Sequence, residues 1–261
     1  MRTLNIAASG MMAQQMNVEV ISNNIANINT VGYKRSRAEF QDLMYQSQLR
    51  PGSTSSDQGD IVPAGIQLGL GVKAAAVARS HSQGPLTPTE NDYDLALEGR
   101  GYFVVTLPTG ESAYSRAGNF KLSPEGTIVT VDGYEVSPGI TVPENTRDVT
   151  INRNGEVLAY VEGQTEPENV GQFDIAMFVN DAGLEAIGSN LYLETPASGV
   201  PLLGIPGQLG FGSVRQGYVE AANVNIVQEI TSLISAQRAY EMNSRTVEAG
   251  DQMLNTLVQM R

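Results

Sequence analysis

Residues 3–28 read TLNIAASGMMAQQMNVEVISNNIANI, and this stretch repeats its apolar side chains every seven residues. One position of the repeat holds Leu4, Met11, Val18 and Ile25, and the other holds Ala7, Gln14, Ile21 and Ile28. Such a repeat is typical of a helix that packs along a partner helix. We therefore predict a helix from about Thr3 to Ile28, which ends before Gly32 because glycine readily takes the left-handed conformation after a helix.

The C-terminal end carries a second repeat of this kind. Its main position is apolar through consecutive heptads, at Ile226, Leu233, Tyr240, Val247 and Leu254. A weaker position runs through Ile230, Gln237, Ser244, Asp251 and Val258, and a further apolar stripe consists of Met242, Ala249, Met253, Leu257 and Met260. A helix that is apolar on more than one side needs more than one neighbour. We predict that residues 223–260 form this helix.

The middle of the chain follows a different pattern, because all 12 prolines lie between Pro51 and Pro206. The apolar period there changes to two, and Asp132-Gly133 and Asn154-Gly155 are hairpin signals. Predicted strands cover residues 102–107, 127–131, 134–136, 149–151, 157–161, 173–179 and 190–194. We also expect a brief return of helix from Ser36 to Tyr45. The chain is therefore assigned to the α+β class, with terminal helices that pair as a coiled-coil-like α domain and an antiparallel β-rich middle domain.

The net charge of −12 is concentrated in the middle, where residues 51–206 carry −13, while residues 1–50 carry +2 and residues 207–261 carry −1. Such a surface repels phosphate backbones, so nucleic-acid binding is disfavoured, whereas the near-neutral ends can approach copies of themselves. Cysteine is absent, which excludes disulfides. The first residues do not resemble a secretory signal, and no run approaches the roughly 20 apolar residues of a membrane span. We expect no cleaved signal and no stable membrane insertion.

The sequence offers little material for catalysis. His81 is the only histidine, and we interpret it as an exposed or hydrogen-bonded core residue. Asp92, Asp94 and Glu98 lack the spacing of a calcium loop and are interpreted as a solvated acidic strand edge. We predict no catalytic residue, no cofactor and no metal, although chance pairs among 28 acidic residues leave carboxylate hydrolysis open.

Three asparagines, Asn23, Asn24 and Asn27, crowd the end of the first predicted helix, although asparagine is a poor helix former. Held between packed helices, such amides fix the register of packing as a buried polar group does. The alternative interpretation is a solvent-facing, fraying helix end.

Motifs at both ends resemble one protein family. The stretches SNNIANINTVGYK at 22–34, GYVEAANVN at 217–225 and QRAYEMN at 237–243 are similar to the N- and C-terminal signatures of bacterial flagellar rod and hook proteins. YSRAGNF at 114–120 resembles the β region that these proteins share. The segment 46–63, GIQLGLGV at 65–72 and HSQG at 81–84 are most like distal rod proteins. Ser22 stands where many relatives have alanine, a change that a packed helix tolerates.

The resemblance implies a structural axial protein and not an enzyme. Such proteins are exported without a cleaved signal and polymerise helically into the drive shaft that transmits motor torque to the hook, between periplasm and outer membrane. The implied partners are further copies in a helical homopolymer, proximal rod proteins, the hook protein, the surrounding L and P ring bushing, the flagellar export apparatus and the rod cap. The implied divisions are an N-terminal helical polymerisation segment at 1–45, a rod-type extended segment at 46–65, a β-rich outer domain at 66–206 and a C-terminal helical polymerisation segment at 207–261.

The family motifs and the heptads together give the expected subunit-interaction residues. From the N-terminal segment these are Leu4, Met11, Val18, Ser22, Asn23, Asn24, Ile25, Ala26, Asn27, Thr30, Gly32, Tyr33 and Lys34. From the C-terminal segment they are Glu220, Asn223, Val224, Ile226, Ile230, Leu233, Gln237, Arg238, Tyr240, Asn243, Val247 and Leu254.

The segment 46–63 is expected to stiffen the rod, although its polar composition also fits a flexible linker. The residues expected to contribute are Arg50, Pro51, Asp57, Asp60, Ile61, Val62 and Pro63. Prolines restrict the backbone near both ends, the arginine faces two carboxylates, and the isoleucine and valine form a small apolar anchor. Two alternative functions stay open: a proximal rod or hook protein of the same family, and an extracellular glycan-binding or glycan-hydrolysing β protein.

Overall fold

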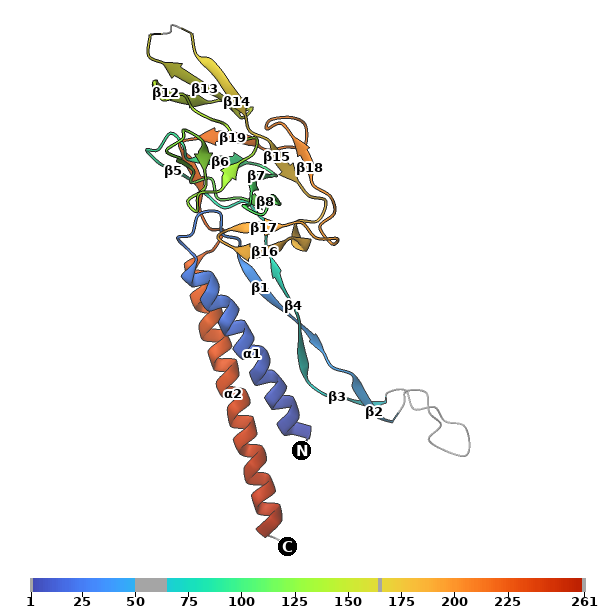
Figure 1. Cartoon of the computed structure of the whole chain (residues 1–261). Coiled ribbons are helices and arrows are strands. Elements are labelled where there is room, and N and C mark those ends of the chain that lie inside the picture. Colours follow the sequence, from blue (N-terminus) through green and yellow to red (C-terminus); the bar gives the residue numbers. More distant parts are fainter. Residues whose placement is uncertain (1, 50–64, 164–165, 260–261) are drawn as a thin grey trace. The chain divides into compact units, whose positions relative to one another are not determined.

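The computed structural model of the chain describes residues 2–49, 65–163 and 166–259 (Figure 1). These residues form two compact units. Of the described residues, the helical unit contains 2–25, 36–49, 65–78 and 226–259, and the β-rich unit contains 26–35, 79–163 and 166–225. Residues 66–78 thus belong with the helices, and residues 207–225 with the β-rich unit. Helices at both ends and an antiparallel β-rich middle confirm the α+β class.

Two antiparallel helices, α1 (Arg2–Ala26) and α2 (Ile226–Gln259), form most of the helical unit. Small residues line their contact: a Cβ atom added at Gly10 would lie 2.8 Å from Asn243 Nδ2, and one added at Gly250 would lie 3.0 Å from Leu4 Cδ2. Among the residues of α2 whose burial is described, Glu229, Ala236 and Gly250 are buried. Glycine and alanine bring the two helix backbones close together, so the larger heptad side chains lie beside this contact or face away from it.

Two antiparallel strand pairs complete the helical unit: β1 (Ser36–Asp42) with β4 (Val72–Arg79), and β2 (Tyr45–Leu49) with β3 (Ile66–Gly69). The expected helix from Ser36 to Tyr45 is therefore wrong. Neither β1 nor the alanine-rich β4 has strong strand propensity, but each satisfies its backbone hydrogen bonds on the other, and such pairing outweighs local preference.

The β-rich unit is built on a nine-stranded sheet in the order β16-β17-β8-β7-β11-β10-β9, with β15 pairing both β7 and β18. Its strands are β7 (Tyr102–Thr106), β8 (Ser112–Ser115), β9 (Lys121–Leu122), β10 (Ile128–Val129), β11 (Glu135–Val136), β15 (Ile175–Met177), β16 (Glu185–Gly188), β17 (Leu191–Leu193) and β18 (Leu202–Gly204). A short 3-10 helix, η1 (Asp181–Gly183), precedes β16.

Smaller sheets surround this one. The strands β12 (Thr146–Ile151), β13 (Glu156–Val161) and β14 (Glu168–Gln172) form a three-stranded sheet, β6 (Leu95–Glu98) pairs with β19 (Ser213–Gln216), and β5 (Leu86–Pro88) pairs with β20 (Tyr218–Glu220). Both predicted hairpins are confirmed: β12 and β13 meet around Asn154-Gly155, and β10 and β11 around Asp132-Gly133. Gly155 and Gly133 have φ of 77° and 86°, which glycine adopts without strain.

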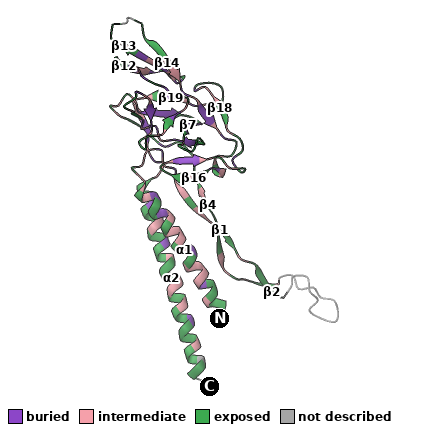
Figure 2. Cartoon of the chain, in the orientation of Figure 1, coloured by how far each residue is buried: buried purple, intermediate pink, exposed green. Residues whose placement is uncertain are grey.

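The main core lies in the β-rich unit, as the purple strands of Figure 2 show, whereas the helices are mostly half-buried or exposed. Phe103, Phe120 and Phe173 pack together at its centre, with ring centroids 5.1 to 6.5 Å apart. A second aromatic cluster joins Tyr102, Tyr114, Phe178 and Tyr192. The β-rich unit therefore has its own core, while the helical unit buries much less apolar surface.

Candidate functional site

Glu220, at the end of β20, is the centre of a buried ion network in the β-rich unit. Its Oε1 accepts hydrogen bonds from Lys34 Nζ at 2.7 Å and from the Gly84 amide at 2.8 Å, and its Oε2 lies 2.9 Å from Arg116 Nε. The side chains of Glu220, Lys34 and Arg116 are 1%, 1% and 5% exposed. Arg116 also donates to two backbone carbonyls, and Lys34 to that of Ser82. Buried ions are tolerated only with such partners.

Four separate sequence motifs meet in this Glu220 network. Lys34 ends the N-terminal signature, Glu220 lies in the C-terminal signature, Arg116 lies in YSRAGNF and Gly84 ends HSQG. Lys34 and Glu220 were expected to contact other subunits, but the contacts described here lie within one chain. Arg116 and Gly84 were quoted as family motifs without a role. The single charged residue in the otherwise uncharged motif YSRAGNF is the signal that could have identified Arg116.

The network contains two cations and one carboxylate, and this imbalance of charge affects the pKa of Lys34. Burial lowers the pKa of Lys34, the charge of Glu220 and its hydrogen bond oppose the shift, and the charge of Arg116 adds to it. The ion pair keeps the ammonium in the interior although desolvation disfavours its charged form.

Backbone contacts at both signatures support the network. The Gly32 amide donates to the Glu220 carbonyl at 2.7 Å, and Gly32 has φ +71°, as predicted. A Cβ there would lie 2.6 Å from the Ala117 nitrogen, so only glycine fits. Asn223 Oδ1 accepts from the Arg35 amide at 2.6 Å, and its Nδ2 donates to the carbonyls of Ser80 and Ser82. The two signatures are therefore held together by backbone and side-chain bonds.

A second buried polar contact lies in the helical unit at Asn24, which is 1% exposed. Its Nδ2 donates to the Ser36 carbonyl at 2.8 Å and to Glu229 Oε2 at 3.2 Å, and its Oδ1 accepts from the Ser36 amide at 2.9 Å. Asn24 thus joins α1, α2 and the start of β1. Of the other two asparagines, Asn23 is exposed, and half-buried Asn27 accepts a hydrogen bond from the Thr30 hydroxyl. The fraying alternative is wrong for Asn24.

The expected interaction residues differ widely in exposure. Buried are Asn24, Gly32, Lys34 and Glu220; half-buried are Leu4, Met11, Val18, Ile25, Asn27, Thr30, Tyr33, Asn223, Val224, Leu233, Asn243, Val247 and Leu254; exposed are Ser22, Asn23, Ala26, Ile226, Ile230, Gln237, Arg238 and Tyr240. The stiffening residues Arg50, Pro51, Asp57, Asp60, Ile61, Val62 and Pro63 lie outside the described residues.

Two hollows run along the helix pair. One of about 620 Å³ is lined by Gln15 and Val18 of α1 and by Gln237, Tyr240 and Glu241 of α2. The other, of about 450 Å³, is lined by uncharged residues: Gln14, Asn17, Gln228, Thr231, Ser232, Ser235, Ala236 and Ala239. The hydroxyls of Thr231 and Ser235 donate to helix carbonyls four residues earlier. The two sides of the helix pair therefore differ in chemistry, one partly apolar and the other polar without charge.

Two residues considered for catalysis or metal binding, His81 and Asp94, are buried or partly buried and hydrogen-bonded to neighbouring side chains. His81 Nδ1 lies 2.8 Å from the Tyr102 hydroxyl, and burial lowers the pKa of His81 to about 4. This agrees with the hydrogen-bonded interpretation of His81. Asp94 is 8% exposed and accepts from Asn91 Nδ2 at 2.9 Å, so the solvated interpretation is wrong for Asp94. No metal-binding cluster occurs among the described residues.

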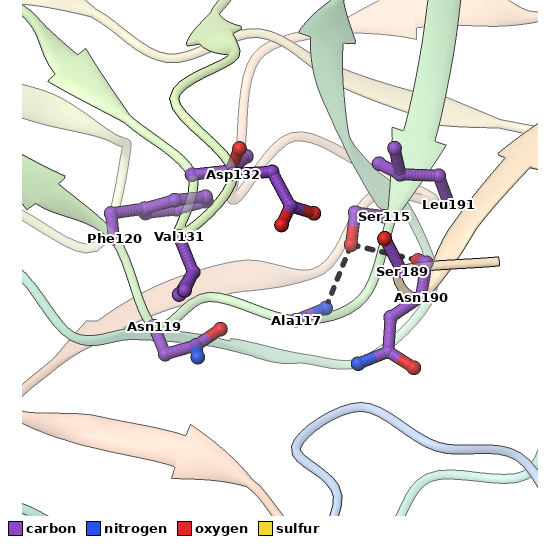
Figure 3. A pocket seen from close by; sticks show the side chains of 10 residues that line it. Ser115, Ala117, Asn119, Phe120, Val131, Asp132, Ser189, Asn190 and Leu191 are labelled. Atoms are coloured by element: carbon purple, nitrogen blue, oxygen red, sulfur yellow. Dashed lines mark hydrogen bonds between the residues drawn. The ribbon is translucent and has the colours of Figure 1, made fainter.

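Figure 3 shows a pocket of about 250 Å³ in the β-rich unit. The Asp132 carboxylate and the Asn119 amide lie at its wall, and Ser115 Oγ donates to the Asn190 carbonyl at 3.0 Å and accepts from the Ala117 amide. The Ser115 hydroxyl donates to a backbone carbonyl and not to a side-chain base, so the described arrangement does not indicate an active site.

Comparison with protein families defines the class of this chain. Residues 4–34 match the model described as flagella basal body rod protein, residues 96–159 match the flagellar hook protein FlgE/F/G D1 domain, and residues 215–260 match the flagellar basal body rod FlgEFG protein C-terminal model. These are rod and hook proteins of the flagellum. In the part of the chain that the structure describes, neither helix is long and apolar enough to cross a membrane.

Individual relatives identify the family more narrowly. The chain is 58% identical to the flagellar basal-body rod protein FlgG of Caulobacter vibrioides over all of both chains. It is 50% identical to FlgG of Agrobacterium fabrum over 97% of each chain, and 46% identical to FlgG of Buchnera aphidicola over 99% of each. The chain therefore belongs to the FlgG family of flagellar basal-body rod proteins. Members of this family are structural subunits of the distal rod in the basal body, where they assemble with their own copies and other flagellar components.

Proposed function

We propose that this chain polymerises helically through its terminal helices into a tubular drive shaft that transmits motor torque to the hook. The observation that supports this function is a ridge of exposed apolar residues on α2. Ile226, Ile230, Ile234 and Tyr240 are 45%, 44%, 45% and 43% exposed although three of them are isoleucines. We call these four residues the α2 ridge.

The α2 ridge exists because the contact between α1 and α2 uses small residues. Ala236 and Gly250 face α1, so the isoleucines on the other sides of α2 remain exposed to water when the chain is alone. Complete burial of such a side chain contributes about 1.5–3 kcal/mol, so covering the exposed half of each contributes about 1 kcal/mol. A polymer repeats this gain in every subunit. We also propose that neighbouring helices pack in a coiled-coil-like manner along the ridge, with the other heptad residues at subunit contacts.

The proposed role needs no catalysis, cofactor or metal. We propose that the partners are proximal rod proteins, the hook protein, the L and P ring bushing, the export apparatus and the rod cap, and that the chain is exported without a cleaved signal. The sequence and the family likeness support this assignment.

We further propose that residues 46–63 stiffen the rod. Sequence supports this part of the proposal, through the prolines, the paired charges and the Ile61-Val62 anchor. Deleting residues 50–63 keeps the strands β2 and β3 in the sequence and should give rods that assemble but bend more easily. Rods of unchanged stiffness would make the segment an ordinary linker.

A substitution in the α2 ridge tests the proposed polymerisation. Ile230→Asp places a charge where an apolar contact is expected, and Ile230→Leu is the matched control because it keeps volume and hydrophobicity. We expect Ile230→Asp to be exported yet to give no rods in isolated basal bodies and no swimming, while Ile230→Leu supports both. Circular dichroism of the purified variants should show an unchanged β-rich unit. Normal rods with Ile230→Asp would refute the proposal.

A further inference from the structure

The β-rich unit has an exposed apolar patch on β15, β18 and the residues that flank them. Val179, Val200, Leu202 and Leu203 are 80%, 81%, 51% and 63% exposed, and we call them the β18 patch. The register pairs Met177 with Leu202. Val179 lies two residues after the end of β15 and Val200 two residues before the start of β18, so both lie at the same end of this strand pair as Leu202.

Three residues of the β18 patch, Val200, Leu202 and Leu203, lie in the longest uncharged run of the chain. Residues 195–214 contain no Asp, Glu, Lys or Arg, in a middle region that carries −13. The next longest uncharged runs are residues 3–18 and 20–33. Both belong mainly to α1, in the unit that is proposed to polymerise. The run that holds most of the β18 patch is the counterpart of these α1 runs in the β-rich unit.

The strand β18 pairs with β15 alone among the described strands, which leaves one edge available. Pro201 and Pro206 flank this three-residue strand. Proline lacks an amide hydrogen and short strands offer few bonds, so continued edge-to-edge pairing is disfavoured. The patch is suited to a contact through apolar side chains.

We propose that the β18 patch binds a second copy of this chain, forming a contact between β-rich units in addition to the helix contacts. The charge distribution favours a copy over a different partner. Two copies of the acidic middle region, residues 51–206 with a net charge of −13, repel each other, so they approach most easily at a patch that carries no charge. A partner with complementary positive charge would instead bind best at the acidic surface. The patch need not meet itself, because a helical polymer uses heterologous contacts.

This inference rests on the proposed polymerisation and is tested separately from it. Benzoylphenylalanine, a photo-crosslinking amino acid, replaces Val200, and intact basal bodies are irradiated. The matched control carries it at Tyr160, which is 40% exposed on β13 and paired with Asp148. We expect a covalent dimer of this chain at Val200, in yield several-fold above that at Tyr160.

Each outcome has a defined meaning. The inference is overturned if rods form but the probe at Val200 gives an adduct with a different protein, no adduct, or no more dimer than the probe at Tyr160. Any of these results would leave the proposed polymerisation intact. A chain with the natural Val200 that forms no rods would instead refute the proposed polymerisation. A second variant, Val200→Asp, should assemble rods that dissociate several-fold faster at low pH or in detergent than those of Val200→Ile, because a charge enters the contact. Equal dissociation of the two variants would also overturn the inference.

Discussion

Removing the carboxylate of the Glu220 network should destabilise the β-rich unit more than removing either of its cations. Glu220→Gln keeps the shape of the side chain but leaves the buried Lys34 and Arg116 without a counter-charge. Loss of one partner from a buried ion pair costs about 3–5 kcal/mol. In Lys34→Met, Arg116 still balances the charge of Glu220. The main loss is the hydrogen bond to the Ser82 carbonyl, and leaving that carbonyl without this partner costs about 1–3 kcal/mol.

Urea unfolding of the purified chain, followed by tyrosine fluorescence, measures this difference, since the chain has 10 tyrosines and no tryptophan. We expect the free energy of unfolding to fall by about 2 kcal/mol more in Glu220→Gln than in Lys34→Met, with unchanged dependence on urea concentration. The double variant should lose less than the sum of the two, because removing Lys34 takes away one of the unbalanced cations. A Lys34→Met variant that is as unstable as Glu220→Gln would refute the charge-balance reasoning.

Limited proteolysis of the monomer should leave a fragment from about residue 26 to residue 225, because Lys34 and Glu220 are part of the β-rich core; a stable fragment that lacks either residue would contradict this. Asn24→Leu should destabilise the helical unit by about 2–3 kcal/mol, since Glu229 and the Ser36 amide lose their partner, whereas exposed Ser22→Ala should change stability by less than about 0.5 kcal/mol; amide hydrogen exchange in α1 and α2 measures both. The unfolded chain binds a proton at His81 near pH 6.5 but the folded chain only near its pKa of about 4, so stability should fall as pH drops through this window, and His81→Gln should remove that part of the pH dependence in urea titrations at pH 4 to 7.5. Identical pH profiles for the two chains would show that His81 does not contribute.

The sequence alone determined the elements whose signals are local. The heptads predicted both helices to within a few residues, and the Asn-Gly and Asp-Gly pairs marked two hairpins, because helix periodicity and turn geometry depend on residues close in the chain. The signatures at the two ends indicated the family for the same reason. Sequence also predicted a buried polar role for the asparagine cluster, although it did not single out Asn24.

Only the tertiary structure decided which residues meet. Lys34 and Glu220 are 186 positions apart in sequence, and nothing local shows that they share a buried ion pair with Arg116. The segment from Ser36 became a strand because β4 supplied its hydrogen-bond partners, which no local pattern predicts. The heptads similarly gave the spacing of apolar residues on α2, but close packing of Gly10 on Asn243 selected the small-residue face for α1 and left the α2 ridge exposed. Packing and charge pairing act between residues that the fold brings together, and for this reason they could not be predicted from sequence order alone.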